Sequence, residues 1–236
     1  RAGLLEPAIR SLPDSRDNPF AERIRRVKKF IRGAKETFAE RFFTWNELFG
    51  QENRKSLLAD GYGVDLPAAP GLFAAALGSL PTDPVNQMLY ADLKISLPGD
   101  MLWKVDMMSM RHPLEVRVPL LDHRVCELAF RIGGEWKIRH GRGKYIFIEA
   151  FKEILPRSLH SRHKWGFEMP ISRWLKTDLH YLIDIYLSRE RIERQGIFNY
   201  PVIEELVTSL MHSRRDTAWQ IWNLIAFQAW YESAMQ

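Results

Sequence analysis

The chain has little that would serve redox, membrane or metal chemistry. Cys126 is the one cysteine in 236 residues, which excludes an internal disulfide, and we interpret its thiol as reduced core filling. No stretch approaches the roughly 18 consecutive apolar residues that a membrane-spanning helix needs. The seven histidines form no HExxH motif and have no cysteine partner at metal-ligand spacing, so we predict no metal site.

Familiar motifs of nucleotide and acyl chemistry are also missing. The GRGKY run at 141–145 contains the Gly-Lys pair of a phosphate loop, but Ile138 and Tyr145 stand where that loop needs a glycine and a Ser or Thr. We interpret the run as a turn before a helix, and no G-x-S-x-G nucleophile motif occurs. The N-terminal segment lacks the apolar core of a secretory signal and does not start with Met. We therefore expect a fragment of a longer, cytoplasmic protein.

What the chain does have is an ordinary globular composition and an unevenly distributed positive charge. Hydrophobic residues make up 46% and charged residues 27%, and the formal net charge is +5. Residues 1–55 hold 13 Lys and Arg against 8 Asp and Glu, which accounts for the whole excess. A basic helix over 20–35 is typical of a solvated face docked by its apolar stripe; binding to nucleic acid or an anionic membrane is the alternative. The stripe consists of Phe20, Ile24, Val27 and Ile31.

Hydrophobic spacing predicts a mainly α chain with few strands and no internal repeat. We place residues 60–71 in a loop because of their Gly and Pro content, and expect Asp216 to cap the last helix. We treat 1–236 as one domain fragment, with a basic helical segment and loop over 1–90 and a helical portion over 91–236. Helices are predicted over 20–35, 36–59, 85–95, 100–110, 122–132, 144–155, 170–185 and from 199 and 216 onward.

The two faces of the predicted helix at 100–110 differ. At about 100° per residue one face is apolar and should meet a core. Asp100 and Lys104 lie on the opposite face, in the i,i+4 order that favours an ion pair. Asp106 lies at the edge of the apolar face, so it needs a cation, N–H donors or a polar ligand, unless the helix is rotated to expose it. The apolar face consists of Met101, Leu102, Val105, Met108 and Ser109.

The stretch after this helix is short and extended. Pro113 ends the helix, because the residue before a proline avoids the helical region. Residues 114–121 alternate, with Glu115 and Arg117 on one side. Asp122 is then a good N-cap for the next helix. The core stripe of that helix is Val125, Leu128, Ala129 and Ile132.

A second informative segment runs from 155 to 174. Arg162, His163 and Lys164 stand directly before the Trp-Gly-Phe run at 165–167, which contains a flexible glycine. A lysine is a compact, mobile charge suited to a phosphate whose charge grows during reaction. A solvated basic loop is the alternative. The apolar residues that should pin the segment to the core are Phe167, Met169, Pro170, Ile171 and Trp174.

Five runs, in this order, resemble the C-terminal part of the synthetase domain of glutamine-hydrolysing asparagine synthetases. They are DMLWKVDMMSM, EVRVPLLDHRV, GKYIFIEAF, LPRSLHSRHKWGFEMPISRWL and RRDTAWQIWNLIAFQAW. The resemblance covers about 92–232. It implies the helical C-terminal portion of an α/β, adenine-nucleotide-α-hydrolase-like (PP-loop) domain whose parallel sheet lies largely outside this chain. It also implies formation of β-aspartyl-AMP from aspartate and ATP with Mg²⁺, then amination by ammonia from glutamine.

The resemblance also implies roles for individual residues. Lys164 corresponds to the family's loop lysine, which contacts the departing pyrophosphate and is the catalytic residue we expect. The helix that lines the aspartate and acyl-adenylate pocket contributes Asp100, Lys104 and Asp106. A structural ion-pair network around the site is expected from Glu115, Arg117 and Asp122.

The chain departs from the family pattern in ways that matter for function. Met107 stands where many relatives have Arg, and the S-G-G-x-D-S loop, the acidic G-E-x-x-D-E segment and the N-terminal nucleophilic cysteine are absent from the sequence. We therefore expect upstream glutaminase and nucleotide-binding regions as partners and predict that this chain alone does not turn over ATP; a homodimer is left open. The alternatives are a related amidotransferase or cyclase acting on another carboxylate, and a non-catalytic helical module that uses the basic helix at 20–35.

Overall fold

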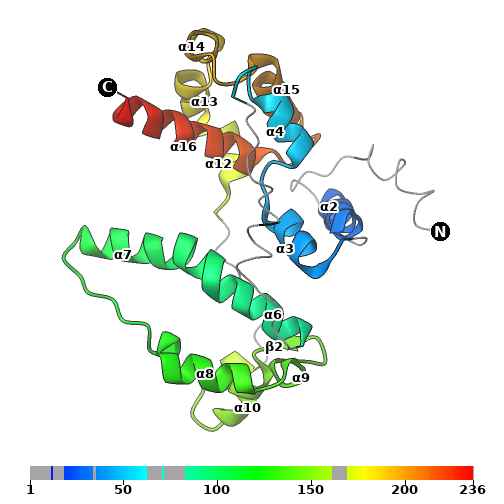
Figure 1. Ribbon diagram of the computed structural model, residues 1–236, viewed down its shortest axis with the longest axis vertical. Coiled ribbons are helices and arrows are strands. Elements are labelled where there is room, and N and C mark those ends of the chain that lie inside the picture. The colour runs from blue at the N-terminus through cyan, green and yellow to red at the C-terminus, as the bar shows by residue number, and fades with distance from the viewer. Residues whose placement is uncertain are drawn as a thin grey trace. The chain divides into compact units, whose positions relative to one another are not determined.

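The computed structural model describes residues 12, 19–33, 36–62, 71, 83–160 and 169–235 (Figure 1). These residues are mostly helical, which confirms the mainly α prediction. Within them the only sheet is a hairpin in which β1 (Ile138–Arg139) pairs antiparallel with β2 (Arg142–Gly143). In the same residues we find no helix with the length and apolarity to span a bilayer.

Contacts divide the chain into two compact units. Unit 1 comprises the described residues within Arg1–Leu72 and Phe167–Gln236, and unit 2 those within Phe73–Gly166. Unit 1 therefore combines segments from both ends of the chain.

Three helices form the N-terminal part of unit 1. The predicted basic helix is α2 (Pro19–Gly33), and its Ile24 is buried, whereas Phe20 and Val27 of the expected stripe are exposed. The single helix predicted over 36–59 is wrong: α3 (Phe38–Asn46) and α4 (Gln51–Leu57) are separate. The backbone is extended at Glu47 and again at Gly50, the N-cap residue of α4, so the helical hydrogen bonds stop between them.

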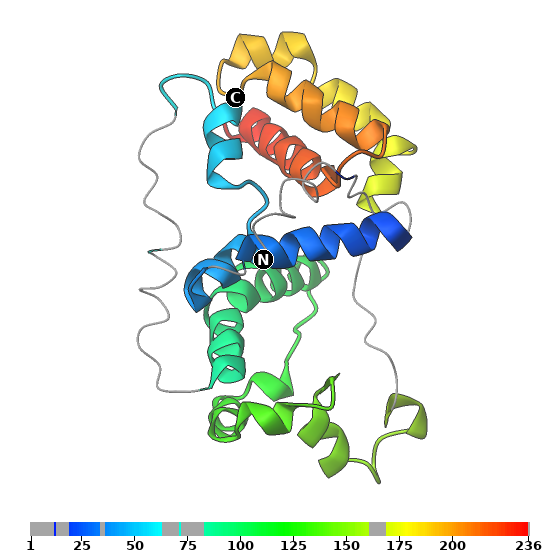
Figure 2. The same cartoon turned by 90° about the vertical axis from the view of Figure 1, so that its right-hand side faces the viewer.

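The C-terminal part of unit 1 holds the main core. Its helices are α12 (Ile171–Lys176), α13 (His180–Tyr186), α14 (Arg189–Gln195), α15 (Tyr200–Met211) and α16 (Ala218–Ala234). Helices α12, α13 and α15 pack against α16 (Figures 1 and 2). The apolar stripe of α15 packs into this core, because Ile203, Leu206 and Leu210 are all buried. The core also contains Leu57, Ile171, Leu175, Ile183, Leu187, Ile192, Ala218, Ile221, Leu224 and Ile225.

Two helix boundaries in this part differ from the sequence prediction. The helix expected over 170–185 is interrupted at Thr177, whose backbone leaves the helical region (φ −129°, ψ −100°). Asp216 does not cap the last helix, because α16 begins one residue later and its N-cap residue is Thr217. The Asp216 carboxylate instead lies 4.0 Å from the guanidinium of Arg25 on α2.

Unit 2 begins with one uninterrupted helical run. It consists of α6 (Pro84–Ala91), the π-helix η2 (Asp92–Leu102) and α7 (Trp103–Met110), so the two helices predicted over 85–95 and 100–110 are joined (Figure 1). Pro98 lies inside η2, where its missing N–H removes one backbone donor and its ring disfavours regular α-helical bonding.

The remaining helices of unit 2 are short. Asp122 caps α8 (His123–Arg131) by accepting the backbone N–H of Arg124 at 2.9 Å, as predicted. The helix predicted over 144–155 ends early, since α10 spans only Tyr145–Ala150. The other elements are η3 (Pro119–Leu121), a 3₁₀ turn, α9 (Gly134–Lys137) and α11 (Arg157–His160).

The expected core faces of unit 2 are not buried. Met101, Val105 and Met108 are 40%, 38% and 57% exposed, and Leu128 of α8 is 61% exposed. The prediction that these faces meet a core is wrong for the chain as it stands, because no described part of unit 2 forms a layer over them. Cys126 is a free, partly buried thiol.

Candidate active site

Asp100 and Lys104 form the first part of the candidate site. Asp100 lies in the last turn of η2 and Lys104 in the first turn of α7, and the Lys104 Nζ is 3.6 Å from the Asp100 Oδ1. The pairing predicted from the i,i+4 spacing is confirmed. Both side chains are more than half exposed, so the pair contributes only about 0.2–0.5 kcal/mol to the helix. Its charged groups are accessible to a solute.

Asp106 is exposed and lies away from that pair. Two residues along α7 correspond to a rotation of about 200°, so Asp106 and Lys104 point to different sides of the helix. Ser109 Oγ donates to the backbone carbonyl of Asp106 at 3.2 Å, but no hydrogen bond or ion pair joins the Asp106 carboxylate to another described residue. The sequence left two outcomes for Asp106, a polar partner or exposure to solvent, and the structure shows exposure to solvent.

The acidic and basic residues between α7 and α8 form two separate groups. Glu115 and Arg117 are exposed and make a close ion pair in the extended segment. Asp122 pairs with Arg124, and the Arg124 Nε lies 3.0 Å from the Asp122 Oδ1. The side-chain hydrogen bond from Arg124, followed by the backbone N–H groups of α8, lowers the pKa of Asp122. Across the described segment we find no bond between Asp122 and the Glu115–Arg117 pair.

Lys164 lies outside the described residues, as do Arg162, His163 and Phe167. The structure does describe the residues that follow this segment. Ile171 is 2% exposed and belongs to the core of unit 1, which confirms its predicted anchoring role. Met169 is 50% exposed, so its predicted contribution to that anchor is wrong.

A buried polar network in unit 2 was missed at the sequence level. Asn86, only 2% exposed, donates to the Asp83 carboxylate at 2.8 Å and to the carbonyl of Ile132 at 3.0 Å. Lys137 donates to the Asn86 side-chain oxygen, and burial lowers the pKa of this lysine while the charge of Asp83 raises it. The Asp-Pro pair at the start of α6 is a recognisable N-cap signal that would have pointed to Asp83.

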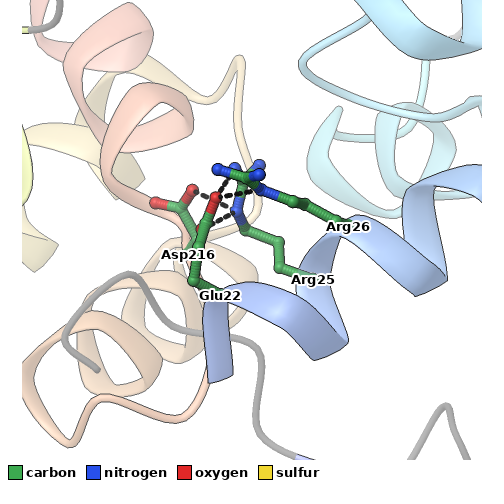
Figure 3. A network of polar contacts seen from close by, with 4 residues as sticks. All are labelled: Glu22, Arg25, Arg26 and Asp216. Carbon is green, nitrogen blue, oxygen red and sulfur yellow. Dashed lines mark hydrogen bonds and ion pairs between the residues drawn. The ribbon is translucent and has the colours of Figure 1, made fainter. Parts of the chain in front are cut away.

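The basic residues of α2 are partly neutralised within the chain. The Glu22 carboxylate accepts hydrogen bonds from Arg25 Nε at 2.7 Å and Arg26 Nε at 2.9 Å, and Asp216 approaches Arg25 from outside the helix (Figure 3). Two of the cations that an electrostatic nucleic-acid site would need are therefore already paired. This weakens the alternative of a nucleic-acid module.

Metal ligation has no clear candidate in unit 1 or unit 2. Among the described residues, no three His, Cys, Asp or Glu side chains converge closely enough to hold a metal ion.

Comparison with known proteins decides the family. A family model described as asparagine synthase matches residues 1–232. The chain belongs to the asparagine synthase family. Asparagine synthetase [glutamine-hydrolyzing] 1 of Bacillus subtilis (strain 168) is 31% identical over 147 residues, which cover 62% of this chain. A putative asparagine synthetase [glutamine-hydrolyzing] of Mycobacterium tuberculosis (strain ATCC 25618 / H37Rv) is 30% identical over 149 residues, or 63% of this chain.

These matches confirm the resemblance and also limit it. Each of the two alignments covers only 23% of the relative's own length, so this asparagine synthase chain corresponds to a small part of those proteins. A more distant relative, Amidase chry2 of Gibberella zeae, is 23% identical over 142 residues, 57% of this chain and 21% of its own. No solved structure matches the chain significantly.

Proposed function

We propose that this chain is the C-terminal part of an ATP-dependent amide ligase that converts aspartate to asparagine. In this reaction a carboxylate oxygen of aspartate attacks the α-phosphorus of ATP, the bond to pyrophosphate breaks, and ammonia from glutamine then displaces AMP from the acyl carbon. The family match over residues 1–232, together with the exposed charges of η2 and α7, supports the proposal.

One charged residue of the helical run, Asp106, is assigned to the acyl substrate. Asp106 has no described partner for its carboxylate, which leaves it available to the ammonium group of an amino acid. Lys104 and Asp100, which pair at 3.6 Å, face another side of α7, so we assign the direct substrate contact to Asp106 alone and a place in the wall of the site to this pair. Glu115, Arg117 and Asp122 are assigned a structural role, because their contacts are local.

Lys164 is assigned to the leaving group. A lysine beside the departing pyrophosphate stabilises charge that develops in the transition state, where such stabilisation has its largest effect on rate.

The exposed apolar face of η2, α7 and α8 is assigned to contact with the parallel sheet of a PP-loop domain. Met101, Val105 and Met108 would lose their remaining solvent exposure there, and because each is already about half buried, each would stabilise the contact by about 1 kcal/mol, roughly half of the value for a fully exposed side chain. Upstream sequence would supply this sheet and the glutaminase.

Apart from Lys164, the sequence offers no loop that fits the nucleotide phosphates, and the described residues offer no ligand set that fits Mg²⁺. The phosphate-loop motif is absent from the sequence, and the described acids do not gather as ligands. We therefore assign both to the upstream region of the parent protein and attribute no step of the reaction to a metal held by this chain.

The deciding experiment measures pyrophosphate release by the intact parent protein with ATP, Mg²⁺ and aspartate. Lys164→Ala should lower kcat by about 100-fold or more. Lys152→Ala is the matched control, because Lys152 is exposed and pairs only with its neighbour Glu149 in the described contacts. An unchanged kcat in Lys164→Ala contradicts the catalytic assignment.

Substrate binding by Asp106 is tested separately. Asp106→Asn should raise the KM for aspartate about tenfold, since it removes one charge-assisted contact, and should leave stability unchanged because the side chain is exposed. Asp92→Asn, an exposed acid of the same helical run, should change neither parameter. Equal KM changes in both variants would leave Asp106 without a specific role.

Another carboxylate is the second candidate substrate, because the Arg expected beside Asp106 is replaced by Met107 and relatives named as amidases also match the chain. The same assay distinguishes the two: pyrophosphate release with a different acid, and none with aspartate, would support the second candidate. Pyrophosphate release by the isolated 236-residue chain would contradict the assignment of ATP binding to upstream sequence.

A further inference from the structure

A pocket in unit 1 shares no residue with the candidate active site. It lies between α14 and the C-terminal end of α16 and has a volume of about 320 Å³. That volume is within the usual range for sites that bind small molecules.

A pair of glutamine side chains forms one wall of the pocket. Gln228 Nε2 donates to Gln195 Oε1 at 2.6 Å, and Gln195 Nε2 donates back to Gln228 Oε1 at 3.2 Å. Gln228 is only 1% exposed, so this exchange fixes its orientation. Because a primary amide has two N–H donors and two acceptor lone pairs, each glutamine keeps one donor and one acceptor outside the pair.

Charges of opposite sign line the same pocket. Arg191 Nη2 lies 3.1 Å from Glu232 Oε2, and its guanidinium also lies over the ring of Tyr186, which holds this ion pair in place. Arg194, one turn further along α14, is exposed and has no ion pair with any described residue. The pocket therefore offers the guanidinium of Arg194, which has no ion pair among the described residues. It also offers the Oε1 atom of Glu232, because the 3.1 Å contact with Arg191 uses Oε2.

We propose that this pocket binds a free α-amino acid with a side-chain amide. Its carboxylate would pair with Arg194, its ammonium with Glu232, and its amide with the remaining donor and acceptor of Gln195, the partly exposed member of the pair. Tyr231 and Met235 supply apolar surface for the methylene groups. An inorganic anion would use Arg194 but would be repelled by Glu232, so a zwitterion matches the arrangement better.

The proposal is independent of the ligase assignment, because it concerns binding without ATP and uses none of the residues from 100 to 122. It is tested on the intact protein by hydrogen–deuterium exchange. L-Glutamine is the first probe, and the readout is protection of amides in 189–195 and 224–235. Protection of amides outside these two segments would come from other sites that bind the same amino acid, and it does not count as support for this pocket.

The expected result is saturable protection of those two segments by L-glutamine. Arg194→Gln should raise the half-maximal concentration about tenfold or more, while its exposed position keeps the fold intact. Arg173→Gln is the matched control: it removes the same charge from an exposed position of α12 that does not line the pocket, and should bind as the unaltered protein does.

Two further probes test the zwitterion. Glutarate lacks the ammonium group and should bind more weakly than L-glutamine, and Glu232→Gln should reduce that difference. Inorganic phosphate should give little protection. No protection by L-glutamine, equal protection by phosphate, or an unchanged half-maximal concentration in Arg194→Gln would overturn the proposal.

Discussion

The carboxylate of Asp83 accepts a hydrogen bond from the backbone N–H of Gly134, 51 residues later in the chain, at 3.2 Å. The same side chain accepts the N–H groups of Asn86 and Val85 at 3.0 Å. These donors, with the Asn86 backbone N–H contributing most, hold the pKa of Asp83 below its usual value. One acid therefore caps α6 and fastens α9 beside it.

Replacing Asp83 with alanine should destabilise unit 2. The change removes the cap of α6 and the contact to Gly134 together, so we expect a loss of about 1–2 kcal/mol in the free energy of unfolding, measured by urea denaturation. Asp92→Ala, at an exposed position of the same helical run, should cost less than about 0.5 kcal/mol. Similar losses in the two variants would show that the Asp83 contacts contribute nothing beyond an average surface acid.

Adding a methyl group at Gly134 should disturb the same contact from the other side. A Cβ there would lie 2.2 Å from Asp83 Oδ1 and 2.6 Å from the Cβ of Val85, so the two helices must separate. We expect Gly134→Ala to lower the melting temperature and to cost roughly 1–3 kcal/mol. Gly143→Ala is the control, since nothing lies within 4 Å of its added Cβ, and an equal effect there would contradict this steric explanation.

Local signals in the sequence predicted several elements correctly. The Asp122 cap of α8 and the Asp100–Lys104 pair depend only on residues within one turn, and the structure has both. The apolar spacing of α15 likewise corresponds to a buried stripe, because its partners α12 and α16 are part of the chain.

Predictions that depended on more distant contacts were wrong. Spacing alone gave one helix over 36–59, but the chain leaves the helix between Glu47 and Gly50, and Leu57 and Phe49 join the core formed by the C-terminal helices. The i,i+3 and i,i+4 pattern around Met101 and Val105 correctly shows an apolar face. It carries no information on whether another layer covers that face.

The candidate site was also predictable only in part, because local spacing does not show which distant residues or ligands a side chain will contact. Helical spacing places Asp100, Lys104 and Asp106 on a helix, but their substrate role came from resemblance, since an exposed acid and an exposed ion pair are common on ordinary helices. Asp83 and Lys137 illustrate the opposite case. These two residues, 54 positions apart, are linked through the Asn86 side chain in a network that no short motif encodes.

Acid should weaken the hydrogen-bonded ion pairs that Glu22 makes with Arg25 and Arg26 within α2. Hydrogen bonding from Arg25, above all, lowers the pKa of Glu22 from 4.5 to about 2. A carboxyl with a depressed folded-state pKa stabilises the fold fully above its unfolded value, so this contribution is present above pH 4.5 and is lost as the pH falls through about 2.

Glu22→Gln should therefore cost roughly 1–2 kcal/mol at neutral pH, and the difference from the unaltered protein should shrink between pH 4.5 and about 2. Urea denaturation at a series of pH values measures it. Glu52→Gln is the control, because Glu52 is 89% exposed and pairs with Lys55 only at 3.8 Å. A cost for Glu22→Gln that does not change with acid would exclude ionisation as its cause.

Thr217 joins α15 to the start of α16. Its Oγ1 donates to the backbone carbonyl of Leu206 at 2.7 Å, and Thr217 is only 3% exposed. Valine has nearly the same shape, so Thr217→Val removes this bond without opening a cavity and should lower the free energy of unfolding by about 1–2 kcal/mol. Thr208→Val, on the exposed side of α15, should have almost no effect. If urea denaturation gave equal stabilities for Thr217→Val and the unaltered protein, the packing of α15 on α16 would depend on apolar contacts alone, because the buried hydroxyl would then contribute nothing that valine cannot replace.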